Sequence, residues 1–306
     1  MQSAYLGKLM ELAQRDTNVL HILADSGTGY DEMFRRSFPE QIYNFGISEE
    51  SMVAAAAGMA TVGKIPFVYT AGAFLAYRSL EFIRDDICFQ NLNVKIVGMG
   101  SGLSWSTLGP THHTTEDLAV LRAMPNLLLL SPSTPKQVSE CTRLAYEHEG
   151  PVYLRIGMNG EKEFFADEYQ MEIGRNDVIF DGKDGVIYTT GSILEEVAQA
   201  RCRLADSGKE HKVVNVATIK PFDVESLKRD ALSYKTIFVV EEHNIHGGLG
   251  SIIAEVTAFG GLGARVVPVG LKDRFAQGYG THAGVRRING LDAEAICEVI
   301  RSTVGE

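Results

Sequence analysis

The chain has 306 residues, of which 45% are hydrophobic and 22% charged, and its formal net charge is −10. This length accommodates two domains of ordinary size, and the hydrophobic share is typical of proteins with packed cores. Because the chain lacks a broad basic field that would neutralise phosphates, we expect no nucleic acid partner.

The cysteines and the N-terminus indicate a reducing compartment and no membrane. Four scattered cysteines form no close pair of the kind found in zinc sites and redox dithiols, so we expect reduced interior side chains. The first residues lack a basic segment followed by an apolar one, and no run reaches the roughly 18 apolar residues of a membrane span. We therefore expect a cytoplasmic protein.

In the first half of the chain, apolar runs of strand length alternate with stretches of helical period. Helices are predicted over residues 6–12, 49–60, 77–88 and 135–146. Strands are predicted over residues 19–24, 65–70, 94–99, 127–130 and 152–156. This alternation predicts right-handed crossovers and a mainly parallel sheet covered on both faces.

Residues 158–183 are polar and show little periodicity, which is typical of a linker, and a second α/β unit follows them. Its strands are predicted over residues 186–190, 213–216, 237–241 and 264–269, and its helices over 193–204, 224–230, 251–258 and 292–302. The predicted fold is α/β, with two doubly wound domains, each with a mainly parallel sheet. We expect the first domain to span residues 1–160 and the second to span residues 184–306, with a linker over residues 161–183.

Segment 44–52 brings a glycine turn, Ser48 and two carboxylates, Glu49 and Glu50, to the head of an alanine-rich helix. Acids in a first helical turn most often complement the helix dipole. The apolar helix body favours a second interpretation, because a carboxylate drawn into a dry interface must gain a partner or a proton.

Two further groups of residues each allow two interpretations. Phe74, Tyr77 and Leu80 recur at helical spacing, which is typical of ordinary core and also of an aromatic pocket wall. His112 and His113 follow a Gly-Pro turn, so each imidazole is either structural or faces a substrate.

Two segments near predicted strand ends are also ambiguous. Arg155 ends a predicted strand, where a guanidinium pairs with a neighbouring carboxylate or binds an anion. The glycines of segment 246–250 serve a tight turn, which we favour, or expose amides for an anion.

Taken together, segments 44–52, 71–78, 109–113 and 239–250 resemble the C-terminal half of transketolase. The resemblance implies thiamine diphosphate as cofactor, with the Glu49 carboxyl bonded to N1′ of its aminopyrimidine ring. Phe74 and Tyr77 would stack on that ring, with Leu80 as a weaker contact. His112 would act in catalysis and meet the substrate, and Arg155 would bind it as well.

Several positions depart from the transketolase pattern, and two of them, Leu108 and Gly100, concern groups that would contact the substrate. Leu108 replaces an aspartate that reads a substrate hydroxyl, and Gly100 replaces a histidine that helps to hold phosphate. Loss of a buried polar partner costs roughly 1–3 kcal/mol of recognition. The substrate is therefore expected to be an unusual or unphosphorylated ketose, or a 2-oxo acid.

The family's Gly-Asp-Gly motif for diphosphate and metal has no counterpart, since the segment 181–185 has the wrong context. We therefore expect no metal ligands here and a companion subunit that holds the diphosphate with Mg²⁺ or Ca²⁺, in an α₂β₂ assembly. The predicted activity is transfer of a two-carbon ketol unit from a ketose to an aldehyde.

Two alternatives remain open. One is a subunit of a 2-oxo acid decarboxylating or acyloin-forming enzyme, similar to dehydrogenase beta subunits or to deoxyxylulose-phosphate synthase. The other is a catalytically silent assembly partner.

Overall fold

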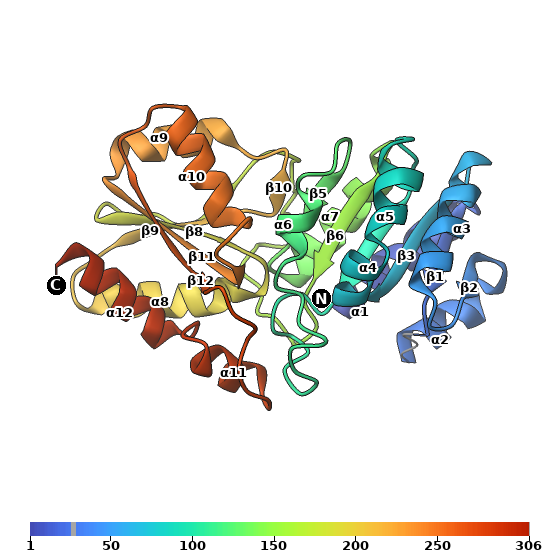
Figure 1. Ribbon diagram of the computed structural model, residues 1–306, viewed down its shortest axis with the longest axis horizontal. Coiled ribbons are helices and arrows are strands. Elements are labelled where there is room, and N and C mark those ends of the chain that lie inside the picture. Colours follow the sequence, from blue (N-terminus) through green and yellow to red (C-terminus); the bar gives the residue numbers. More distant parts are fainter. Residues whose placement is uncertain (26–28, 306) are drawn as a thin grey trace.

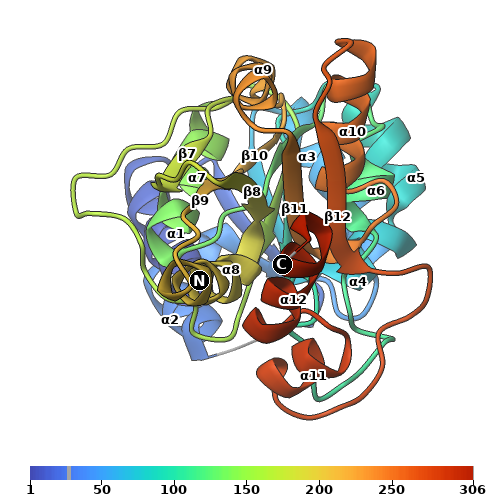
Figure 2. The ribbon, with the colours of Figure 1, turned by 90° about the vertical axis from the view of Figure 1, so that its left-hand side faces the viewer.

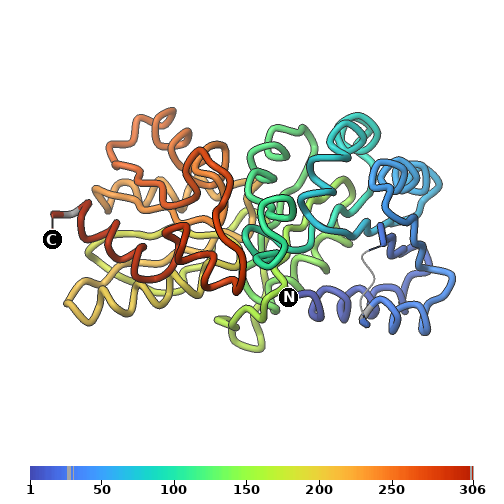
Figure 3. Tube along the Cα trace, turned by 60° about the horizontal axis from the view of Figure 1, so that its bottom comes forward, coloured from blue at the N-terminus to red at the C-terminus, as the bar shows by residue number. Residues whose placement is uncertain are grey.

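The computed structural model describes residues 1–25 and 29–305. Two α/β domains lie side by side, and each is built on its own mainly parallel sheet, which confirms the predicted fold class (Figure 1). The chain starts near the junction of the two domains and ends at the outer end of the second (Figure 3). Within the described ranges, no helix has the length and apolar character needed to cross a membrane.

The first sheet has seven strands in the order β10-β5-β6-β4-β3-β1-β2. All neighbours are parallel except β10, which runs antiparallel to β5. Its strands are β1 Val19–Leu23, β2 Ile42–Asn44, β3 Ile65–Ala71, β4 Lys95–Met99, β5 Leu128–Leu130, β6 Val152–Ile156 and β10 Thr218–Lys220. The central strands β1, β4 and β6 are buried along their whole length, as expected of a parallel sheet covered on both faces.

Helices cover both faces of this sheet, with α1 and α7 on one side and α3 to α6 on the other (Figure 2). The helices are α1 Gln2–Arg15, α2 Gly29–Ser37, α3 Glu49–Thr61, α4 Gly72–Arg78, α5 Leu80–Phe82, α6 Asp117–Leu121 and α7 Pro135–Glu147. A short 3₁₀ helix spans Pro39–Gln41. Alternate residues of β1 enter different cores, Leu20 and Ile22 facing α3 while Val19 and Leu23 face α1.

The second sheet has five strands in the order β12-β11-β8-β9-β7, parallel except for β7. Its strands are β7 Asp177–Phe180, β8 Gly185–Thr190, β9 His211–Asn215, β11 Thr236–Asn244 and β12 Arg265–Leu271. Its helices are α8 Leu194–Asp206, α9 Val224–Ser233, α10 Leu249–Phe259, α11 His282–Ile288 and α12 Ala293–Val304, with a 3₁₀ turn at Gly191–Ile193. A third hydrophobic core lies between this sheet and the helices α8 and α12.

Several details differ from the sequence-based expectations. The predicted helix 77–88 begins earlier, as α4 and α5, and ends as a π-helix over Ile83–Cys88. The predicted linker contains β7, which pairs with β9 of the second sheet. Strand β10 comes from the second half of the sequence yet joins the first sheet. Three cysteines are buried as expected, but Cys202 is exposed.

Candidate functional site

Three chain segments converge at the carboxyl edge of the first sheet. Glu49 begins α3 shortly after β2, Phe74 lies in α4 directly after β3, and His112 lies in the loop after β4. Because these strands are parallel, their following loops meet at one edge, where such sheets place their ligands. All three side chains line one cavity of about 390 Å³.

Glu49 is 1% exposed although it carries a carboxylate. A turn with Gly46 at φ +70° delivers it to the start of α3, and the Ser48 hydroxyl donates to the Phe45 carbonyl. The Arg78 guanidinium donates to Oε2 of Glu49 and forms an ion pair with it. The buried carboxylate therefore has the charged partner that burial requires.

Aromatic rings line the same cavity as this carboxylate. The Phe74 and His112 rings meet edge to face with centroids 5.0 Å apart, and the Trp105 ring lies 6.2 Å from His112. The guanidinium carbon of Arg78 lies 5.1 Å from the Phe74 ring centroid, within the range of a cation–π contact. The cavity thus combines the buried Glu49 carboxylate with a cluster of aromatic surfaces.

The two neighbouring histidines have different surroundings. Nδ1 of His112 is 2.9 Å from the Thr111 hydroxyl, and its ring faces the cavity. His113 is buried outside the cavity lining, and burial lowers its pKa because the charged form loses hydration. Of the pair, only His112 is placed to meet a ligand in this cavity.

Tyr77 and Leu80 do not belong to the cavity lining in this chain. The Tyr77 hydroxyl donates to the Glu116 carboxylate at 2.9 Å and accepts from the Glu116 backbone N–H at 3.0 Å. Burial raises the pKa of Tyr77. Leu80 packs against the hydrophobic core. Phe74 is therefore the one member of the expected stripe that the structure brings to Glu49.

The Trp105 indole, which lines the cavity, packs directly against Gly100. Gly100 has φ +79°, and a Cβ atom there would lie 2.0 Å from Nε1 of Trp105, so the indole occupies the space of any larger side chain. Leu108, 46% exposed, lines the same cavity together with Met99 and Met158. This part of the wall is apolar.

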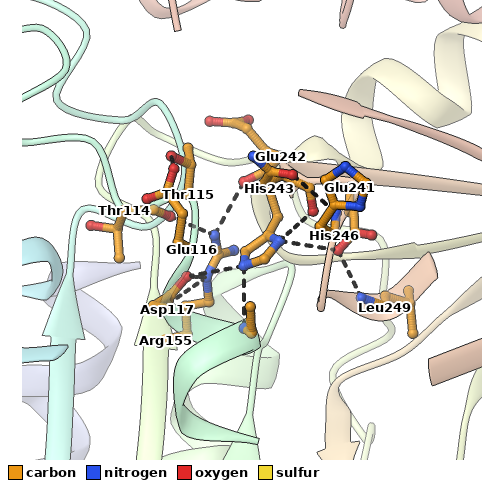
Figure 4. A network of polar contacts seen from close by, with 12 residues as sticks. Thr114, Thr115, Glu116, Asp117, Arg155, Glu241, Glu242, His243, His246 and Leu249 are labelled. Carbon is orange, nitrogen blue, oxygen red and sulfur yellow. Dashed lines mark hydrogen bonds and ion pairs between the residues drawn. The ribbon is translucent and has the colours of Figure 1, made fainter. Parts of the chain in front are cut away.

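Arg155 lies at the end of β6 as expected, but it is 1% exposed and lies outside the cavity lining, at the seam between the domains (Figure 4). Its Nε donates to the Asp117 carboxylate at 2.9 Å, and its Nη2 donates to the carbonyls of Thr114 and Glu242. Burial alone would lower the pKa of Arg155, but the nearby Asp117 charge keeps that pKa above its usual value. The second domain covers this strand end, so Arg155 joins the domains rather than facing the cavity.

The second domain contributes more buried charge to this seam. Burial alone would raise the pKa of Glu242, but the charges of Arg286 and His282 hold that pKa well below its usual range. The Glu242 carboxylate accepts from both of these side chains and from the Leu103 backbone N–H. Glu242 thereby ties the loop after β4 to the second domain.

The glycine segment 246–250 is explained by a neighbouring carboxylate. Glu241 accepts from the backbone N–H groups of Leu249 and Gly250, each at 2.8 Å, at the start of α10, and Figure 4 shows the contact with Leu249. A Cβ atom on Gly248 would lie 2.1 Å from Oε2 of Glu241. The glycine permits this close approach, and the chain's own carboxylate occupies the amides that an anion would use.

Two features of the site were not expected from the sequence. Arg78 belongs to no recognised sequence motif. Only its position four residues after Phe74 would have indicated that the two side chains lie on one face of a helix. Trp105 is the chain's single tryptophan, and its role is visible only once the loop is folded over Gly100. For metals, the described part of the chain holds no group of three or more His, Cys, Asp or Glu side chains that could bind one.

Comparison with known proteins places both domains. Residues 1–158 match the transketolase pyrimidine binding domain, and residues 174–296 match the transketolase C-terminal domain. The chain is 34% identical over 296 residues to a subunit of the apulose-4-phosphate transketolase of Actinobacillus succinogenes, covering 96% of this chain and 95% of that protein. It is 35% identical to a putative transketolase C-terminal section of Methanocaldococcus jannaschii, covering 98% and 95%.

Solved structures agree with this. A split gene transketolase, described as an inactive beta4 tetramer, superposes with a TM-score of 0.90 at 35% identity and covers 98% of this chain and 97% of that chain. The transketolase of Campylobacter jejuni shares the fold, with a TM-score of 0.78 at 18% identity, and this chain spans 46% of its length. The chain therefore belongs to the transketolase family and corresponds to the half of it that carries the pyrimidine-binding and C-terminal domains.

Proposed function

We propose that this chain is one subunit of a thiamine-diphosphate enzyme that transfers a two-carbon ketol unit from a ketose to an aldehyde. The observation that carries the proposal is that the buried Glu49 carboxylate and the Phe74 ring line one cavity at a sheet edge. A heteroaromatic ring needs both groups, a carboxyl to hydrogen-bond a ring nitrogen and an aromatic surface to hold the ring in place.

The residues present fit the pyrimidine end of the cofactor. When bound, thiamine diphosphate supplies the nucleophilic carbon for the transfer. Glu49 hydrogen-bonds N1′ and holds a proton at that atom, while Phe74 positions the ring. His112, which lines the cavity with Trp105, donates to or accepts from a substrate oxygen. Tyr77 and Leu80 remain candidate cofactor contacts for the assembled enzyme.

We propose that a companion subunit holds the diphosphate end of the cofactor and its Mg²⁺ or Ca²⁺ ion, in an α₂β₂ assembly. The relatives support this: one is named as a single subunit of its transketolase, and a similar chain forms an inactive tetramer of beta chains. Cavity residues Ile47 and Leu108 are 76% and 46% exposed, which suits a surface completed by another chain.

The apolar part of the wall supports an unusual substrate. Trp105, Leu108 and Met158 offer no charged group to a phosphate. We propose that the preferred substrate is unphosphorylated at the end that meets this wall. Matched pairs of phosphorylated and unphosphorylated ketoses, assayed with one aldehyde, test this, and a preference for the phosphorylated member of each pair contradicts it.

A 2-oxo acid is the second candidate substrate, because Leu108 leaves no acceptor for a sugar hydroxyl at its position in this chain. Release of carbon dioxide from pyruvate or another 2-oxo acid, measured against ketol transfer from a ketose, separates the two reactions.

The central test mixes this chain with its companion and measures ketol transfer. Turnover by the Glu49→Gln complex should fall about 10²–10⁴-fold, as expected when an acid–base group is lost. The adjacent Glu50→Gln is the matched control and should stay within about twofold. Robust transfer by the isolated chain would contradict the two-subunit proposal. A silent partner would instead leave thiamine diphosphate affinity unchanged in both Glu49→Gln and Phe74→Leu complexes.

A further inference from the structure

Arg78 contacts the two groups that the proposed function assigns to the cofactor ring. It is the last residue of α4 and lies one helical turn beyond Phe74, on the same face. Its Nη1 donates to Oε2 of Glu49, and its guanidinium carbon lies 5.1 Å from the Phe74 ring centroid. Among the described contacts, Arg78 is the one charged partner of the Glu49 side chain.

The Arg78 guanidinium is chemically similar to the aminopyrimidine ring of the cofactor. It is planar and cationic, carries N–H donors at its edge, and binds both carboxylates and aromatic faces. A protonated aminopyrimidine presents the same features to the same two partners. The Arg78 side chain is 40% exposed, whereas that of Glu49 is 2% exposed, so the arginine is the partner with room to leave.

We propose that Arg78 holds the Glu49 carboxylate in the chain without cofactor, and that cofactor binding exchanges the guanidinium for the ring as the partner of that carboxylate. This inference rests on the proposed function. The exchange keeps the Glu49 carboxylate paired at every stage, which avoids a buried charge without a partner. It also means that the cofactor competes with an internal group, so its apparent affinity is its intrinsic affinity multiplied by the fraction of sites that Arg78 leaves free.

Calorimetric titration of the mixed complex with thiamine diphosphate and Mg²⁺ tests the exchange. Arg78→Met should lower the Kd about 3–10-fold, because an ion pair of this exposure is a modest competitor. Arg84→Met is the matched control, since Arg84 is exposed and pairs with the adjacent Asp85. The Arg84→Met complex should bind thiamine diphosphate with the same Kd as the wild-type complex. An Arg78→Met complex that binds equally or more weakly overturns the exchange and assigns Arg78 a permanent place beside Glu49.

A double-mutant cycle identifies the group that holds the guanidinium. In a Glu49→Gln background the affinity gained by Arg78→Met should shrink below about twofold, because the ion pair is already gone. A gain that persists at full size contradicts the proposed competition for the Glu49 carboxylate. Arg78→Gln serves as a second variant if Arg78→Met fails to assemble.

The two proposals fail in different ways. Saturable binding by the wild-type complex with an unchanged Kd in Arg78→Met overturns the exchange and leaves the proposed function in place. Absence of any saturable binding by the wild-type complex overturns the proposed function, and the exchange with it.

Discussion

The cavity and the domain seam both contain buried charge at the carboxyl edge of the first sheet, but they partner it differently. In the seam, Arg155 meets Asp117 and two carbonyls, and Glu242 meets Arg286, His282 and a backbone amide. In the cavity, Glu49 meets a single cation whose side chain is 40% exposed. Fully partnered charge fixes the two domains together, whereas singly partnered charge remains available for exchange with a ligand.

The largest effect on stability is expected at the centre of the seam. Arg155→Met should lower the free energy of unfolding by about 3–5 kcal/mol, because it leaves the Asp117 carboxylate buried without its cation. Urea unfolding of the chain measures this, with the exposed Arg84→Met expected within about 0.5 kcal/mol of the wild type. A stable Arg155→Met chain that loses only substrate affinity in the mixed complex would move Arg155 from the seam to the substrate site.

Glu242 makes the seam sensitive to acid. The pKa of Glu242 in the folded chain lies below its value of about 4.3 in the unfolded chain. Its contribution to the free energy of unfolding is therefore complete above about pH 4.3 and is lost as the pH falls below that value. Glu242→Gln should cost about 2–3 kcal/mol at pH 7, and the difference from the wild type should shrink below about pH 4. Urea unfolding at pH 7, 5 and 3.5 measures this. A difference that stays constant or grows in acid contradicts the assigned ion pairs.

A backbone position behind the cavity residue Trp105 should have an intermediate effect. Gly100→Ala places a methyl group against the Trp105 indole at a positive φ, and should cost about 1–3 kcal/mol. Fluorescence of Trp105, the chain's single tryptophan, reports whether the wall rearranges. Gly58→Ala in α3 is the control, since it meets no atom within 4 Å and should be neutral or slightly stabilising. Equal stabilities of the two variants would refute the packing of Trp105 on Gly100.

The outer part of the seam should matter least. Arg122 and Glu255 bridge the domains by two hydrogen bonds, but their side chains are partly exposed. Arg122→Met should therefore lower the free energy of unfolding by less than about 1 kcal/mol. Thermal melts at low and high salt measure it, and a loss well above that value would show that the seam depends on its rim rather than on Arg155.

Much of the fold could be predicted because the strands are short apolar runs separated by helical periods. Strand β6 has the predicted bounds, and β1 ends one residue early. Strand β10 could not be predicted to join the first sheet, since three residues carry no periodicity and their partner β5 lies about 90 residues away. The π-helical turn after α5 likewise leaves no signal in the residue pattern.

The candidate site was predictable in part. Glu49, Phe74 and His112 follow three parallel strands of one sheet, β2, β3 and β4, so their meeting at one cavity follows from the parallel order of the sheet. Arg155 also ends a neighbouring strand, but the second domain covers that end, and domain packing cannot be read from the strand itself. The contact of Arg78 with Glu49 depends on a side chain reaching between two helices, which spacing alone does not predict.

The most direct test of the account is deuterium exchange at the thiazolium carbon of thiamine diphosphate bound to the mixed complex, measured by acid quench and NMR. The wild-type complex should exchange this proton orders of magnitude faster than free cofactor, and the Glu49→Gln complex should lose most of that acceleration. Exchange at the wild-type rate in a Glu49→Gln complex that binds the cofactor would contradict the claim that Glu49 activates it.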